Sequence, residues 1–164
     1  MPAVSDTSPI SALAILGRLS LMKQQFGDVL IPKGVHRELE QLTDPIARKS
    51  IDEASREGWL RIVPCKDKDL VATLALTLDE GEAEAIALSL EYSSCRLMID
   101  EIEGRRVARN LKVPVVGTLG ILLKARREGF IASMSEEVRA LRQKAGFFIS
   151  PQLERDFLRE AGEI

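Results

Sequence analysis

The sequence predicts an α/β fold: a three-layer α/β/α sandwich around a mostly parallel, five-stranded sheet. Two observations predict it. Short apolar runs alternate along the chain with segments of helical periodicity, which is the pattern of βαβ units. The chain has 164 residues, long enough to bury a sizeable core without a disulfide or metal staple. We expect a single domain over residues 1–164, with C-terminal helices at about 133–162 as an elaboration.

Five runs have the length and composition of buried strands. They are expected at residues 3–5, 29–31, 60–63, 96–99 and 113–116. Pro32 and Pro64 close the second and third runs, because proline has no backbone N–H for a sheet ladder. These short strands, separated by helical segments, predict right-handed crossovers and helices on both faces of the sheet.

Helical segments are bounded by recognisable start and stop residues. Ser8 followed by Pro9 is typical of an N-cap and a first helical position, and Gly17 is typical of an end. The strongest periodicity spans residues 79–92. Helices are expected at residues 9–16, 19–25, 35–42, 45–57, 67–76, 79–92, 102–111, 118–127, 135–145 and 151–161.

Composition excludes several classes of function. Lys plus Arg is 23 and Asp plus Glu is 25, so a net charge of −2 excludes a protein that coats nucleic acid by bulk positive charge. One histidine, His36, and two distant cysteines exclude multi-histidine zinc sites and zinc ribbons. Aromatic residues make up 4% of the chain, which argues against modules that stack bases on aromatic platforms. No targeting or membrane-spanning pattern is present, so we expect a cytoplasmic protein without membrane contact.

Two acids follow predicted strands directly. Asp6 follows the first strand and Asp100 the fourth, and functional sites in open α/β sheets form at the carboxyl ends of strands. Each acid could instead cap the helix that comes next. Ser8 is the better placed cap for the first helix, which leaves Asp6 for another role.

Two glutamates on predicted helices could reach the same edge. Glu38 lies beside the apolar stripe of its helix, and Glu82 shares the core-facing side of residues 79–92. Glu80 and Glu84 are better explained by the positive end of the helix dipole or by exposure. A buried carboxylate is costly without a partner, and a cation is a reasonable one.

Asp6, Glu38, Glu82 and Asp100 offer only carboxylate oxygens. Such a set suits Mg²⁺ or Mn²⁺ and the hydrolysis of phosphodiesters. Arginines and lysines nearby could hold phosphates, although a solvated face explains them equally well. They are Arg105, Arg106, Arg109, Lys124, Arg126 and Arg127, and Thr7 and Thr118 could add hydroxyl hydrogen bonds.

Several motifs resemble those of PIN-domain nucleases, in particular a prokaryotic branch related to VapC-type toxins. They are Val4-Ser5-Asp6-Thr7-Ser8-Pro9, the segment 31–39, the run Leu78-Asp79-Glu80-Gly81-Glu82-Ala83-Glu84, and Leu97-Met98-Ile99-Asp100-Glu101 with Gly117-Thr118-Leu119-Gly120. Their order and spacing cover nearly the whole chain.

The resemblance implies a Mg²⁺- or Mn²⁺-dependent endoribonuclease that cleaves single-stranded RNA. It implies the toxin of a toxin–antitoxin pair, with an antitoxin protein as partner, and a homodimer. Carried over by position, the metal ligands would be Asp6, Glu38, Glu82 and Asp100. The motifs leave open whether Glu82 or Glu84, and Asp100 or Glu101, are the ligands.

Other interpretations remain possible on the sequence alone. The fold could serve as a catalytically silent module that binds RNA or a partner protein. A dehalogenase-type phosphatase also begins with an acid at a strand end, but Ser8 stands where a second acid is usual. In the C-terminal segment, Phe147, Phe148, Leu153, Phe157 and Leu158 are expected to pack on the core, or else to cover a dimer surface or a groove for a partner helix.

Overall fold

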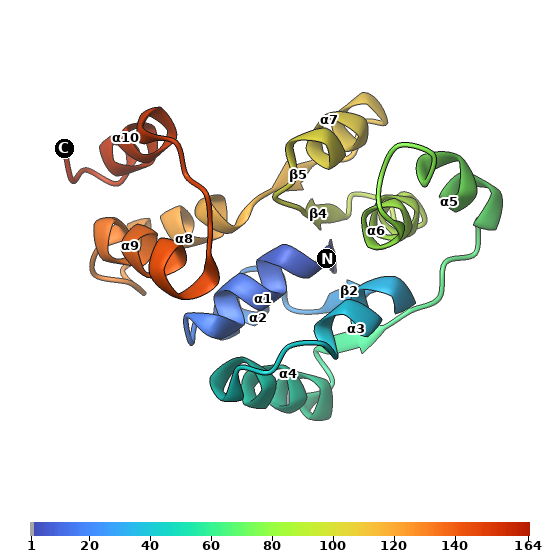
Figure 1. The fold of residues 1–164 in the computed structure, drawn as a ribbon, viewed down its shortest axis with the longest axis horizontal. Helices are drawn as coiled ribbons and strands as arrows, with labels where there is room; N and C mark the ends of the chain where they lie inside the picture. Colours follow the sequence, from blue (N-terminus) through green and yellow to red (C-terminus); the bar gives the residue numbers. More distant parts are fainter. Residues whose placement is uncertain (1) are drawn as a thin grey trace.

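The computed structural model describes residues 2–164 and is built around one parallel sheet. The strands stand in the order β3-β2-β1-β4-β5, and every neighbouring pair is parallel. Their bounds are β1 Ala3–Ser5, β2 Val29–Ile31, β3 Leu60–Ile62, β4 Arg96–Met98 and β5 Val115–Val116. Figure 1 shows the sheet between helices on both faces. The predicted α/β/α sandwich with a five-stranded sheet is therefore confirmed.

Ten helices connect and cover the strands in the described chain. They are α1 Thr7–Ile15, α2 Ser20–Phe26, α3 Lys33–Leu39, α4 Pro45–Glu57, α5 Lys68–Leu74, α6 Glu80–Leu90, α7 Ile102–Asn110, α8 Thr118–Arg127, α9 Met134–Ala145 and α10 Pro151–Glu160. Helices α5, α6 and α7 cover one face, and α1, α2, α4, α8 and α9 cover the other (Figure 1).

Alternation along the strands divides the interior into two cores. Ala3 faces the core under α1 and α8, whereas its neighbour Val4 faces the core under α6. Both residues are completely buried. A sheet covered on both faces needs apolar side chains at successive positions, which is why these strands read as continuous apolar runs and not as alternating ones.

Six helix starts and three strands differ from the sequence expectation, most of them by one residue. The first helix starts at Thr7 and not at Pro9, because the Ser8 hydroxyl does not cap it but donates to Asp100. Helix α3 starts directly after Pro32, two residues earlier than predicted. Helix α6 starts at Glu80, with Asp79 as its cap. The fifth strand is only Val115–Val116, and Val113 is buried beneath the helical layer without joining the ladder.

The C-terminal helices pack along α8, but only through part of their apolar surface. Glu163 accepts backbone N–H bonds from Met134 at 2.6 Å and Ser135 at 3.0 Å, which fastens the end of the chain to the start of α9. Phe157 and Leu158 are partly buried against the core. Of the expected apolar set, Phe148 is 90% exposed and Leu153 is 41% exposed, so packing on the core does not hold for these two side chains.

No helix in the part of the chain that the structure describes is long and apolar enough to span a bilayer.

The packing predicts a clear contrast between two leucines. Leu88 on α6 is completely buried, whereas Leu76, just after α5, is 82% exposed. We expect Leu88→Ala to lower the free energy of unfolding by about 2–5 kcal/mol, through lost burial and the cavity left behind. Leu76→Ala should change it by about 0.5 kcal/mol or less. Urea denaturation of both variants checks this, and similar values for the two would contradict the assigned core.

Candidate metal centre

The candidate site lies at the carboxyl edge of the sheet, where its connectivity changes direction. From β1 the chain moves outward through β2 and β3, and it then returns to the other side of β1 to form β4 and β5. Asp6 follows β1 and Asp100 follows β4, so both lie where the two halves of the sheet part. Open α/β sheets place their ligands in the crevice at such a switch point.

Asp6 is a buried carboxylate that does not cap the helix that follows it, α1. Its backbone N–H donates to the carbonyl oxygen of Met98 at 2.9 Å, which ties the end of β1 to β4. It occupies the N-cap position of α1, but its side chain makes no capping hydrogen bond there. Only 4% of the residue is exposed.

Burial and neighbouring negative charge disfavour ionisation of Asp6. Its pKa rises from 3.8 to about 7, mainly because burial removes solvent and in part because of the charges of Asp79, Glu38 and Asp100. The backbone N–H of Thr7 opposes this rise. The charged side chains that act on Asp6 are therefore all acidic.

Glu82 on α6 is the second buried carboxylate. It is 8% exposed, and burial is the main reason that its pKa rises from 4.5 to about 8. Asp79, Asp6 and Glu101 raise it further by their charge. A methyl group on Gly104 of α7 would lie 3.0 Å from Oε2 of Glu82, so a residue without a side chain lets α7 approach this carboxylate.

Asp79 belongs to this group, although the sequence analysis did not select it. Its side chain accepts the backbone N–H of Glu82 at 2.8 Å and so caps α6. Asp79 also hydrogen-bonds the Glu82 carboxyl group, which favours the protonated form of Glu82. The signal was present in the sequence: an acid followed three residues later by glutamate is a capping-box pattern.

Glu38 on α3 is exposed and lies close to the start of α6. A methyl group on Gly81 would lie 2.5 Å from Oε1 of Glu38 and 3.6 Å from Oδ1 of Asp79. Glu38 therefore rests over Gly81, beside Asp79. Any side chain at Gly81 would push Glu38 away from the group.

Asp100 is held by three hydrogen bonds. Its carboxylate accepts the Ser8 hydroxyl at 2.9 Å, the Thr118 hydroxyl at 2.8 Å and the Thr118 backbone N–H at 2.7 Å. Asp100 thus caps α8 and not α7, the helix that follows it in sequence. Glu101 stands at the N-cap of α7 without a side-chain capping bond and is exposed.

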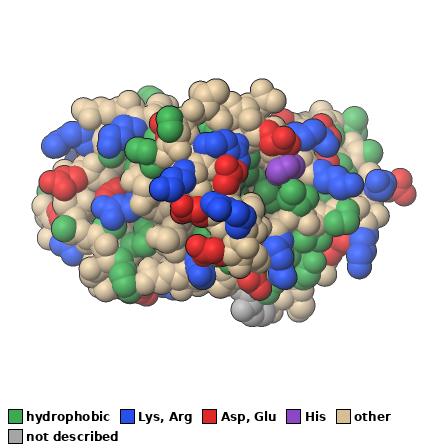
Figure 2. Space-filling model, turned by 90° about the horizontal axis from the view of Figure 1, so that it is seen from below, with side chains coloured by type: hydrophobic (Ala, Val, Ile, Leu, Met, Phe, Trp, Pro, Cys, Tyr) green, Lys and Arg blue, Asp and Glu red, His purple; other side chains and the backbone are tan. Residues whose placement is uncertain are grey.

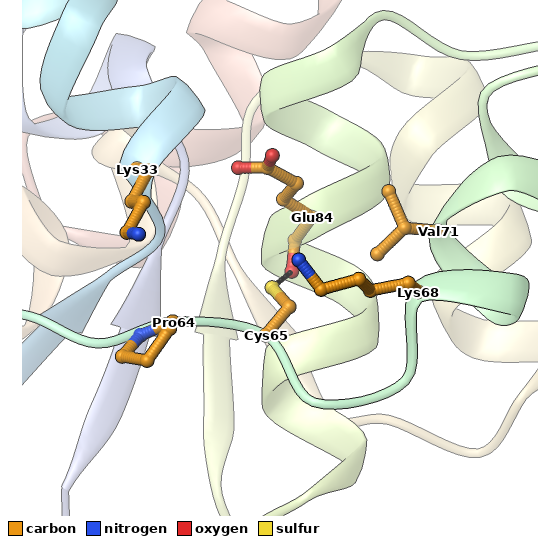
Figure 3. Close-up of a pocket in the computed structure, with 6 residues that line it drawn as sticks. All are labelled: Lys33, Pro64, Cys65, Lys68, Val71 and Glu84. Carbon is orange, nitrogen blue, oxygen red and sulfur yellow. Dashed lines mark hydrogen bonds between the residues drawn. The ribbon is translucent and has the colours of Figure 1, made fainter.

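Glu84 lies apart from this group. Its carboxylate accepts the backbone N–H of Gly34 at 2.7 Å, at the start of α3. Figure 3 shows Glu84 with Lys33, Cys65 and Lys68, which line the same pocket. The volume of this pocket is about 270 Å³. The Cys65 thiol donates to the Glu84 carbonyl oxygen at 3.3 Å, and burial raises the pKa of this thiol to about 11, so it stays protonated at neutral pH.

Most of the basic residues singled out in the sequence have local partners. Arg105 donates to the carbonyl oxygen of Ile99 at 2.9 Å, beside Asp100. Arg106 pairs with Glu103, whereas Arg126 and Arg127 pair with Glu163 and Glu160 at the C-terminus. Figure 2 shows basic and acidic side chains interspersed on one face. Among the six basic residues named in the sequence analysis, Arg105 lies beside Asp100 of the candidate site.

The donor set fits a hard divalent cation. Asp6, Glu82 and Asp100 present carboxylate oxygens, with Glu38 and Asp79 beside them, and no soft ligand takes part. Two of these groups are buried among like charges, which a cation would neutralise. Within residues 2–164, no three such side chains are already grouped closely enough to hold an ion together. The fit therefore rests on the chemistry and burial of the oxygens.

The comparison with known families agrees with this geometry. A family profile described as a PIN domain matches residues 2–163. The chain belongs to the PIN-domain family. The match includes the C-terminal helices, and PIN domains are in general nucleases that use divalent metal ions. No curated protein matches the chain.

Stability of the metal-free PIN domain should fall as the pH rises. Asp6 and Glu82 have pKa values near 7 and 8 in the folded protein, against 3.8 and 4.5 ordinarily, so the folded state binds protons that the unfolded chain releases. Their contribution to stability is complete below about pH 4 and is lost as the pH rises through 7 and 8. Urea denaturation in EDTA at several pH values measures this slope.

Asp6→Asn provides the matched comparison, because it keeps the shape of the side chain without its charge. The slope should be shallower in this variant, and the difference in stability from the wild type should grow between about pH 4 and pH 7 and stay constant at higher pH. Identical slopes for the two proteins would contradict a buried, poorly solvated Asp6.

Proposed function

We propose that the protein is a Mg²⁺- or Mn²⁺-dependent endoribonuclease that hydrolyses phosphodiester bonds in single-stranded RNA. One observation carries the proposal. Asp6 and Glu82 are buried carboxylates whose charged neighbours are other acids, and they lie at the carboxyl edge of an α/β sheet in a family of nucleases. A divalent cation supplies the compensating charge, and an anionic phosphodiester can then approach.

Each residue has a role that follows from its position. Asp6, Glu82 and Asp100 would hold the ion through their carboxylate oxygens, and Glu38 would complete the set from α3, directly or through water. Asp79 positions Glu82 through the α6 cap. Ser8 and Thr118 fix the orientation of the Asp100 carboxylate through hydrogen bonds. Asp100 is therefore held in place although it lies in a short loop and not in a helix.

The ion, when bound, would activate water for in-line attack and neutralise charge on the phosphodiester. The protein's own contribution is electrostatic and positional. Before the ion binds, the acidic group repels a phosphate, so activity should depend strictly on the metal. Arg105, beside Asp100, is placed to meet a phosphate oxygen on the β4–β5 side of the crevice.

The biological setting is proposed from the motif resemblance. By that resemblance the protein acts in the cytoplasm as the toxin of a toxin–antitoxin pair, forms a homodimer, and is inhibited by an antitoxin protein. The net charge of −2 and the interspersed surface charges support recognition of a short RNA segment over extended coating of nucleic acid.

A catalytically silent PIN domain that binds RNA or a partner protein is the second candidate. The observation that favours it is the Asp100 carboxylate, both of whose oxygens already accept hydrogen bonds from Ser8 and Thr118. In this alternative Asp100 is a structural cap for α8 and the acidic group holds no catalytic ion.

Cleavage of labelled single-stranded RNA with Mn²⁺, Mg²⁺ or EDTA tests the proposal. We expect cutting with either metal and none in EDTA. Asp6→Asn and Glu82→Gln should each lower the rate by about a hundredfold or more, because each removes a buried anionic ligand. Glu84→Gln is the matched control, since it lies on the same helix with its carboxylate turned to α3.

Equal losses in Glu82→Gln and Glu84→Gln would contradict the ligand assignment. An absence of cutting by folded wild-type protein with either metal, together with retained RNA binding, would favour the silent module.

A further inference from the structure

Two cavities open on either side of the segment that follows α9, and both reach Asp100. One, of about 460 Å³, lies between α1 and this segment, and the other, of about 550 Å³, lies between the segment and β5. Asp100, Ile102, Phe147 and Phe148 line both. One of the proposed metal ligands, Asp100, therefore also lines an apolar space.

The larger cavity gathers aromatic side chains in a chain that has few. Phe147, Phe148 and Phe157 line it, and they are three of the five phenylalanines in the sequence. Phe148 is 90% exposed and Ile102 is 85% exposed, although large apolar side chains usually avoid water. Their exposure is unexplained by packing of the chain itself.

Charged side chains line one end of this otherwise apolar cavity. Arg105 and Asp100 line that end, with Gly117 between them: a methyl group there would lie 2.8 Å from Nη1 of Arg105 and 2.9 Å from Oδ1 of Asp100. Leu119, Leu153 and Phe157 form the remaining apolar wall. An occupant must therefore present a flat apolar body to the phenylalanines and an anionic group near Arg105.

We infer that this cavity is a nucleobase subsite, in which the base of a nucleotide flanking the scissile phosphate stacks on Phe148. The inference rests on the proposed ribonuclease function and adds a substrate contact to it. A single-stranded nucleotide has the required form, with a planar base joined to a phosphate. Stacking of bases on aromatic side chains is tolerant of sequence and contributes substantially to single-strand binding. The low aromatic content of the chain excludes an extended platform but not one stacked base.

The test uses RNA binding in an Asp6→Asn background, where the loss of a ligand keeps the RNA intact. A labelled oligonucleotide whose cut position has been mapped with the wild type is compared with copies that lack the base on the 5′ or the 3′ side of that position. Adding Phe148→Ala should weaken binding of the intact oligonucleotide about tenfold or more. Phe148→Ala should leave unchanged the binding of the oligonucleotide that lacks the stacked base, because that oligonucleotide has no base to place on Phe148.

Substitutions at exposed phenylalanines separate stacking from other effects. Phe148→Tyr keeps an aromatic ring and should bind as the parent does, whereas Phe148→Leu keeps apolar bulk and should bind as weakly as Phe148→Ala. Phe130→Ala, at a side chain that is 51% exposed just after α8, is the control and should have no effect. Because Phe148 is exposed, none of its variants should change the melting temperature.

Three results would overturn the inference. The first is an equal loss of binding to the intact RNA and to both abasic oligonucleotides on Phe148→Ala, and the second is unchanged binding to all three. The third is a change in the molar mass of the protein in solution on Phe148→Ala, which would assign the cavity to contact between copies of this chain. If the wild type cuts no RNA and the Asp6→Asn protein binds none, the ribonuclease function itself is wrong. If the wild type cuts RNA but Phe148→Ala has no effect on binding, only the nucleobase subsite is wrong.

Discussion

The site depends on one unfavourable arrangement: two carboxylates, Asp6 and Glu82, are buried with acidic side chains as their charged neighbours, and Asp6 is one of the charges that oppose ionisation of Glu82. Burial of a lone charge is costly, and burial of two like charges is more so. Proton binding relieves this cost at low pH, and a divalent cation relieves it at neutral pH. The surrounding fold keeps both groups at the same edge of the sheet regardless, through the β1–β4 pairing and the capped start of α6.

The edge is organised by hydrogen bonds that cross between elements distant in sequence. Asp100 after β4 caps α8 through Thr118, and Glu84 on α6 accepts the Gly34 N–H of α3. Each of these carboxylates therefore links two elements that are far apart in the sequence. Glycines at 81, 104 and 117 leave room for these contacts, because a side chain at each position would meet a carboxylate oxygen.

The sequence predicted the fold well because burial on both faces of a parallel sheet leaves continuous apolar runs. Pro45–Glu57 and Thr118–Arg127 were predicted with their observed ends, since Asp44–Pro45 and the Gly117–Thr118 pair mark clear starts. The start of α1 was missed because the Ser8 hydroxyl bonds Asp100, 92 residues away, and no local pattern reports such a bond. The exposure of Phe148 was missed for a similar reason, since an apolar side chain looks the same in sequence whether it packs on the core or on a ligand.

The account depends most directly on cation binding at Asp6 and Glu82. Isothermal titration of Mn²⁺ into the wild type and Asp6→Asn at about pH 6 and pH 8 measures it. Because the ion must displace protons from two groups with raised pKa values, the wild type should bind more tightly at the higher pH and release protons to the buffer. Asp6→Asn should bind at least tenfold more weakly, with less proton release. Mn²⁺ binding that is unchanged in Asp6→Asn would contradict the assignment of the metal centre.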